Sequence, residues 1–140
     1  PYRGGAPAIQ DIVAGNVQMM FGNMPEFLGQ IGGGNLIPIA FGSPRVSPLF
    51  PNLPLMSTYL PGYEVVNWFA IFGPKGLPAD LVDTWNKALR GAVAKADVQK
   101  RFVENGMDTV IGSPQQLKDT IVADRKKWQE VIQSAGMRAD

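Results

Sequence analysis

A pair of glycines near the start of the chain has the residue pattern of an anion-binding turn. The stretch Tyr2-Arg3-Gly4-Gly5-Ala6 passes from an apparent strand end directly into a helix-forming sequence. Glycines leave backbone N–H groups accessible, and a helix start gathers these groups at the positive end of its dipole, where they bind anions. The P-loop and dinucleotide-binding motifs are both absent. The turn therefore predicts either a simple anion site or a tight corner with no ligand.

A second candidate turn follows the next apparent strand. Gly22 and Asn23 join residues 16–21 to a predicted helix, and the Asn23 amide could donate to a ligand oxygen. Asn23 and Glu26 also have the spacing of a capping box, which would use the asparagine oxygen on the helix backbone. If both strands are parallel, the two turns lie at the same end of the sheet, where ligands of open α/β folds bind.

A third candidate lies within the strongest strand signal, residues 64–72. The run Asn67-Trp68-Phe69 combines a polar side chain with two aromatic ones. Such a run belongs either to the core or to the wall of a cleft. We expect Phe69 in the core, and the pattern leaves Trp68 open between the two.

Composition excludes several kinds of chemistry. The 140 residues include no cysteine and no histidine, so thiol catalysis, disulfides, Cys/His zinc sites and Ser-His-Asp triads are excluded within this chain. Nothing in the sequence predicts a cofactor or a metal. The net charge is +1, and the basic cluster at residues 125–128 lies beside Asp124 and Glu130 on an amphipathic helix. This pattern is typical of a solvated face and predicts no nucleic-acid partner.

The elements that must position these residues alternate between strands and helices. Apolar, β-branched runs predict strands at 16–21, 36–41, 64–72 and 109–111, with Pro1 and Tyr2 ending another. Helical periodicity and cap signals predict helices at 6–14, 23–31, 79–95, 97–105 and 114–135, and one helical turn at 56–60. This order predicts an α/β fold with helices packed over a mostly parallel sheet.

Charge divides the chain into two parts. Residues 1–74 hold five charged side chains, and the other twenty lie in residues 75–140. We interpret residues 1–74 as an α/β core and residues 75–140 as a helical C-terminal segment. Apolar stripes that include Trp85 and Trp128 run along this segment. They predict packing onto the same lobe or self-association through the C-terminal helices.

Three stretches together resemble the solute-binding receptors of tripartite tricarboxylate transporters, the Bug-type family. They are PYRGGAPAIQDIVAGNVQMMFGN, LPGYEVVNWFAIFGPKGLPADLVDTWNKAL and VENGMDTVIGSPQQLKDTIVADRKKWQEVIQSAGMRAD. The resemblance covers essentially the whole chain. It implies a periplasmic-binding-protein type II-like lobe, namely the second of two, with a first lobe upstream of Pro1 and a C-terminal tail that crosses back toward it.

The resemblance also implies a function. Family members are periplasmic, non-enzymatic receptors that capture small mono-, di- or tricarboxylates and deliver them to membrane permease subunits. The matching ligand-binding positions are Tyr2, Gly4, Gly5, Ala6, Asn23 and Trp68. Many members carry an acidic residue where this chain has Gly22, so this chain lacks that carboxylate. The alternatives are a regulatory ligand-sensing or enzymatic α/β domain that uses the same helix ends, and a purely structural domain.

Overall fold

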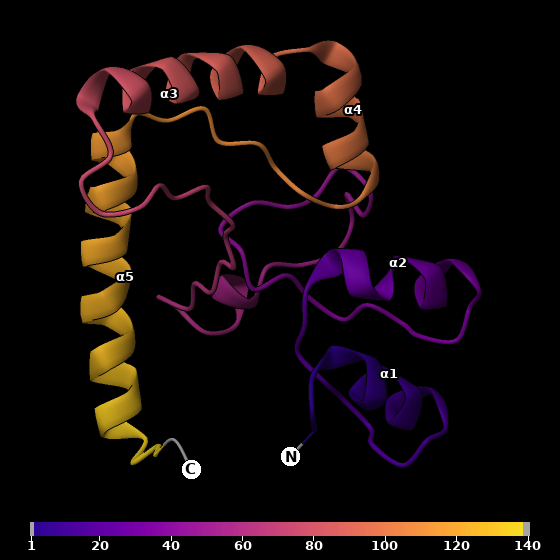
Figure 1. The fold of residues 1–140 in the computed structure, drawn as a ribbon. Helices are drawn as coiled ribbons and strands as arrows, with labels where there is room; N and C mark the ends of the chain where they lie inside the picture. Colours follow the sequence, from indigo (N-terminus) through magenta and orange to yellow (C-terminus); the bar gives the residue numbers. More distant parts are fainter. Residues whose placement is uncertain (1, 139–140) are drawn as a thin grey trace. The chain divides into compact units, whose positions relative to one another are not determined.

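The computed structural model of the chain describes residues 2–138. The chain divides into two compact units, which are described separately. The first unit comprises Pro1–Ile71 and Ala96–Thr109, and the second comprises Phe72–Lys95 and Val110–Asp140. The first unit holds helices α1, α2 and α4 and the short 3-10 helix η1, and the second holds α3 and α5 (Figure 1). The predicted division at residue 74 stays a prediction.

The helices of the first unit follow their sequence signals closely. They are α1 (Gly5–Val13), α2 (Met24–Gly32), η1 (Met56–Thr58) and α4 (Ala96–Glu104). Both α1 and α4 end where a glycine takes a positive φ, at Gly15 and Gly106, as is common after a helix C-terminus. Helices α1 and α2 pack against each other (Figure 1). The predicted helices of this unit are therefore confirmed to within about two residues.

The second unit is built on two longer helices, α3 (Ala79–Val93) and α5 (Pro114–Ser134). The predicted cap of α5 is confirmed. The amide of Gln116 donates to Ser113 Oγ at 3.2 Å, and the Ser113 amide donates to Gln116 Oε1 at 2.7 Å. The Asn86 side chain of α3 donates to the carbonyl oxygen of Gly112 at 3.1 Å, which ties the two helices together just before that cap.

The predicted sheet does not form within residues 2–138, where no residue is assigned to a strand. The expected strands 16–21, 36–41, 64–72 and 109–111 contain at most one bridge residue, because Phe41 and Leu55 form an isolated parallel bridge. Tyr2 is likewise not in a strand, and Pro1 lies outside the described residues. Apolar and β-branched residues favour extended backbone, but a strand also needs a neighbour in register. The sequence pattern shows residues that favour extended backbone, but it does not show whether a neighbouring strand lies in register.

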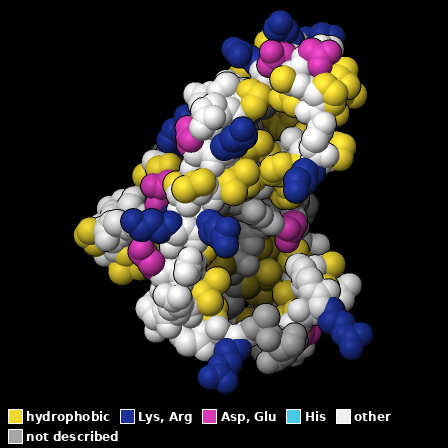
Figure 2. Space-filling model, turned by 60° about the vertical axis from the view of Figure 1, so that its left-hand side comes forward, with side chains coloured by type: hydrophobic (Ala, Val, Ile, Leu, Met, Phe, Trp, Pro, Cys, Tyr) yellow, Lys and Arg dark blue, Asp and Glu magenta, His cyan; other side chains and the backbone are white. Residues whose placement is uncertain are grey.

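Much apolar surface is consequently open in this structure. None of the side chains in residues 2–138 is fully buried. The expectation of a core position for Phe69 is wrong, because its side chain is 82% exposed and no facing sheet or helix covers it. Of the two tryptophans in the predicted apolar stripes, Trp85 on α3 is 61% exposed and Trp128 on α5 is half-buried. Hydrophobic side chains also lie openly on the face in Figure 2.

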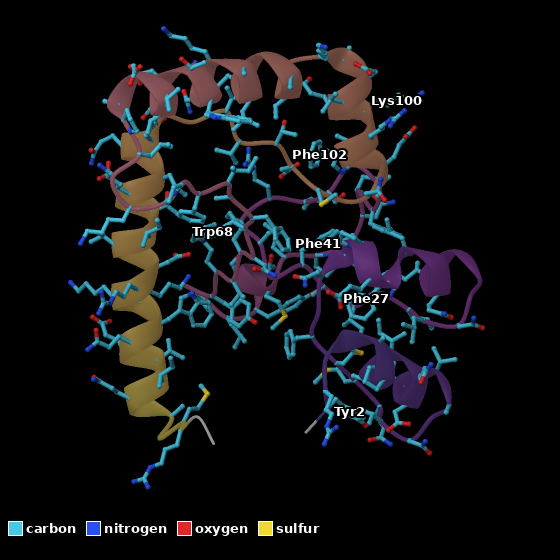
Figure 3. All side chains as sticks on the ribbon, viewed as in Figure 1. Tyr2, Phe27, Phe41, Trp68, Lys100 and Phe102 are labelled. Atoms are coloured by element: carbon cyan, nitrogen blue, oxygen red, sulfur yellow. The ribbon has the colours of Figure 1, made fainter. Side chains whose placement is uncertain are left out.

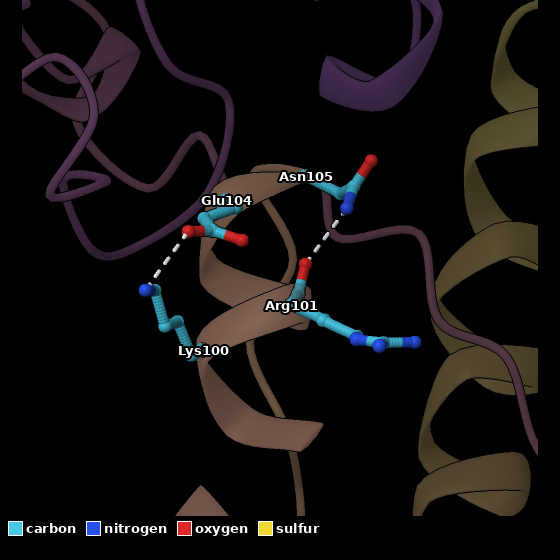
Figure 4. A network of polar contacts seen from close by, with 4 residues as sticks. All are labelled: Lys100, Arg101, Glu104 and Asn105. Carbon is cyan, nitrogen blue, oxygen red and sulfur yellow. Dashed lines mark hydrogen bonds and ion pairs between the residues drawn. The ribbon is translucent and has the colours of Figure 1, made fainter. Parts of the chain in front are cut away.

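Helix α4 carries the ion pair and the helix-end contact drawn in Figure 4. Lys100 Nζ and Glu104 Oε1 are 3.7 Å apart, and the Asn105 side chain donates to the carbonyl oxygen of Arg101 at 2.7 Å. The two ion-pair side chains are largely in solvent, so this pair adds little to stability.

Among the described residues, none of the helices combines the length and the apolar character that crossing a membrane requires.

Candidate functional site

The start of α1 has the geometry that the glycine pair predicts. Gly4 has φ 106° and ψ −179°, a conformation that glycine adopts readily and other residues do not. The helix begins at Gly5, with no side-chain cap on its amides and no acidic residue in its first turn. Pro7 has no N–H, so the first-turn donors are the amides of Gly5 and Ala6. This helix end therefore lacks a capping group of its own.

Asn23 lies at the start of α2, as predicted, but its side chain makes a different hydrogen bond from the predicted one. Asn23 is the N-cap residue, with φ −87° and ψ 137°, and its side chain does not cap the helix backbone. Its Nδ2 instead donates to Glu26 Oε1 at 2.8 Å. The capping-box prediction is therefore wrong. The reason is that another donor engages the asparagine oxygen.

That donor is Asn67, which lies 44 residues further along the chain. Its Nδ2 donates to Asn23 Oδ1 at 2.8 Å. An amide that accepts through its oxygen and donates through its nitrogen has a fixed orientation, because either end would clash electrostatically if it were flipped. Asn67, Asn23 and Glu26 thus form a chain of side-chain hydrogen bonds that ends on a carboxylate.

The carboxylate of Glu26 lies against the start of α1. Its Oε2 occupies the space that a Cβ on Gly5 would fill, so a larger residue at this position would require the carboxylate to shift. Glu26 is in the first turn of α2, where a negative charge is favourable. The same carboxylate therefore stands at the N-terminal ends of two helices. The spacing of Asn23 and Glu26 was the sequence signal for this pair, but it did not indicate the contact with Gly5.

Tyr2 is directed to a different part of α1. Its hydroxyl donates to Asp11 Oδ2 at 2.7 Å, and the Asn16 side chain donates to Asp11 Oδ1 at 3.2 Å. The hydrogen bond from Tyr2, followed by that from Asn16, holds the pKa of Asp11 below its ordinary value of 3.8. The same bond raises the pKa of Tyr2 above 10.0. Figure 3 shows Tyr2 beside α1. Sequence reasoning did not identify Asp11 as its partner.

Replacing Tyr2 with phenylalanine should raise the pKa of Asp11, because the largest cause of its depression is removed. In the native chain, the lowered pKa means that Asp11 stabilises the fold above pH 3.8 and that this contribution disappears as the pH falls through the folded-state pKa. NMR titration of the Asp11 carboxyl carbon measures the shift. The control is Tyr59→Phe, since Tyr59 is 69% exposed, and it should leave Asp11 unchanged. Equal Asp11 titrations in Tyr2→Phe and the native chain would contradict the assignment.

The structure brings most of the predicted site residues into one unit and links several of them. Gly4, Gly5 and Ala6 form the start of α1, and Glu26 connects this end to Asn23. Trp68, which Figure 3 labels, is half-buried. It directly follows Asn67, whose side chain donates to Asn23. The hydroxyl of Tyr2 is occupied by Asp11 and does not take part in this arrangement. The result is a helix start at Gly4 and Gly5 with the Glu26 carboxylate beside it, and hydrogen bonds link that carboxylate to Asn23 and, through Asn23, to Asn67.

Comparison with known proteins places this arrangement in context. Residues 1–137 match the family described as the tripartite tricarboxylate transporter family receptor. The protein BugT of Bordetella pertussis is 31% identical over 139 residues. Two solved structures superpose well: the R. palustris protein Rpa4515 with adipate, at 28% identity and a TM-score of 0.88, and the periplasmic binding protein BugD, at 29% identity and a TM-score of 0.85.

These similarities run along nearly all of this chain but along only part of each relative. The matches cover 99% of the chain for BugT, 97% for Rpa4515 and 100% for BugD. The corresponding shares of the relatives are 43%, 46% and 48%. The chain thus spans less than half the length of each of them.

Proposed function

The chain belongs to the tripartite tricarboxylate transporter family of receptors, and from this premise we propose that it forms part of a periplasmic receptor that captures a small organic carboxylate. In this proposal the receptor is not an enzyme, and it hands its ligand to the membrane permease subunits of a tripartite tricarboxylate-type transporter. The ligand is a mono-, di- or tricarboxylate. Similarity to Rpa4515, whose structure holds adipate, supports the ligand class.

The observation that carries the proposal is the uncapped start of α1. Gly4 and Gly5 expose backbone donors at a helix end that lacks any acidic residue or side-chain cap of its own. A carboxylate at such an end gains both hydrogen bonds and the favourable field of the helix. We propose Gly4, Gly5 and Ala6 as the carboxylate contacts and Asn23 as a further donor or orienting group. Trp68 and Tyr2 complete the proposed ligand-binding set as wall residues.

The magnitudes of these interactions set the expected affinity. A helix end contributes about 0.3–1 kcal/mol, and up to about 2 kcal/mol when partly buried. Each hydrogen bond to a charged group adds roughly 1.5–3 kcal/mol. Micromolar binding needs about 8 kcal/mol after the costs of ordering. The contacts in this chain fall short of that, so it should bind carboxylates only weakly, with a Kd near the millimolar range.

An amide-resolved NMR titration of the isotope-labelled chain with adipate tests the proposal. The amides of Gly4, Gly5 and Ala6 should shift saturably with a Kd of about 1 mM, which corresponds to roughly 4 kcal/mol. Hexanediol, which has the same carbon number and no carboxylate, is the matched control and should leave these amides unchanged. Shifts confined to other residues would contradict the site. An absence of saturable shifts with adipate, succinate and citrate would contradict carboxylate capture by this part of the receptor.

We propose that the extended segments, residues 64–72 above all, pair into the mostly parallel sheet of a type II binding-protein lobe in the assembled receptor. The similarity to BugD supports this. Slow amide exchange at residues 64–72 in a receptor that carries both lobes would agree, and rapid exchange there would contradict it. We also keep the division of the chain into an α/β core, residues 1–74, and a helical C-terminal segment, residues 75–140.

The exposed stripe of α3 leads to one further expectation. Trp85 is 61% exposed, so in isolation the chain has apolar surface available for self-association through its C-terminal helices. Sedimentation velocity over a range of concentrations tests this. A single monomeric species at all concentrations would contradict it.

A further inference from the structure

The position of Glu26 bears on how tightly the proposed site binds its ligand. The proposed ligand is a carboxylate, yet the structure already places the Glu26 carboxylate beside Gly5 at the start of α1. Glu26 Oε2 fills the space next to Gly5, which an added side chain at that position would have to enter. No acidic residue of α1 itself lies in its first turn. The anion at this helix end is therefore supplied by α2.

Glu26 is held there by neighbours and does not merely extend into solvent. Asn23 Nδ2 donates to its Oε1 at 2.8 Å, and Asn67 Nδ2 in turn donates to Asn23 Oδ1 at 2.8 Å. The first bond leaves Oε2 as the oxygen that faces Gly5. Asn23 at the start of α2, itself held by the distant Asn67, thus fixes the direction in which this negative charge points.

We infer that Glu26 lowers the affinity of the proposed site by acting as a built-in competitor for the carboxylate of the ligand, an inference that rests on the proposed function. A ligand carboxylate that contacts the Gly5 and Ala6 amides must either displace the Glu26 side chain or accept its repulsion. The exposed position of Glu26 makes displacement feasible, because its carboxylate can turn into water. The competitor weakens the binding of every carboxylate at this helix start, so tight capture needs additional contacts elsewhere in the receptor.

The variant Glu26→Gln tests this inference, because it removes the charge and keeps the shape and the acceptor oxygen for Asn23. Adipate should bind to it about three- to tenfold more tightly than to the native chain, in the range expected when one exposed like-charge interaction is lost. Glu104→Gln is the matched control. It also removes one negative charge from a helix of the same unit, where Glu104 pairs only with exposed Lys100, and adipate affinity should not change.

A second measurement needs no ligand. If Glu26 occupies the helix end, the amide resonances of Gly5 and Ala6 in the ligand-free chain should move in Glu26→Gln and stay in place in Glu104→Gln. Unmoved amide resonances in Glu26→Gln would overturn the inference. Weaker or unchanged adipate binding by this variant would overturn it as well, because adipate affinity must rise when a competing charge is removed. If the amides move but neither chain binds any carboxylate, the proposed function fails while the placement of Glu26 stands.

Discussion

Replacing Gly106 with alanine should destabilise the chain by about 2–4 kcal/mol, for two separable reasons. Gly106 has φ 68°, in the left-handed region that costs other residues roughly 1–2 kcal/mol. A Cβ there would also overlap the Met24 side chain, whose Cβ lies only 3.0 Å away. Displacing a packed side chain typically costs a further 1–3 kcal/mol or so. Urea denaturation, with the midpoint and slope fitted together, measures the loss in unfolding free energy.

Gly34→Ala separates the two reasons. Gly34 has φ 73° and lies in the same unit, but a Cβ on it would meet nothing within 4 Å. It should show only the backbone cost, about 1–2 kcal/mol. The difference between the two variants is then the cost of moving Met24. Equal losses would mean that the end of α4 does not press against the start of α2, and the contact described for Gly106 would be wrong.

Replacing Gly22 with alanine should also destabilise the chain, by about 1–3 kcal/mol. A Cβ at this position would lie 2.5 Å from Phe27 Cζ and 2.7 Å from Cε2, so the aromatic ring must move. Phe27 is half-buried and lies on α2, directly after the residue that carries the Glu26 carboxylate (Figure 3). The same measurement of unfolding free energy applies. An acidic residue at this position would likewise need Phe27 to take another orientation.

A double-mutant cycle identifies Phe27 as the cause. In a Phe27→Leu background the shorter side chain leaves room, so Gly22→Ala should cost about 1 kcal/mol less than in the native chain. Gly29→Ala is the control within α2, because nothing lies within 4 Å of its Cβ position. It should stabilise the helix by about 0.5–1 kcal/mol. If Gly22→Ala behaves like Gly29→Ala, Phe27 does not crowd Gly22.

The sequence by itself determined the helices and the family. Helix starts and ends are encoded within a few neighbouring residues, as Ser113 and Gln116 show at α5 and as Gly15 shows after α1. Local signals of this kind can be recognised without knowledge of what lies opposite. The glycine turn at Gly4 was predictable for the same reason, since its positive φ is a property of one residue and its neighbours. Several motifs in a fixed order were enough to indicate the receptor family.

Only the tertiary structure decided which long-range partners the polar side chains take. Asn23 had the spacing of a cap, but Asn67 engages its oxygen and Glu26 its nitrogen. The sequence cannot show a partner 44 residues away, because hydrogen bonds of that kind depend on how segments meet in space. Strand pairing cannot be predicted from the sequence for the same reason. The extended segment around Phe69 has the β-branched and aromatic residues typical of a strand, but within the described part of the chain it has no neighbouring strand in register. The position of the Glu26 carboxylate beside Gly5 was likewise decided only by the tertiary structure.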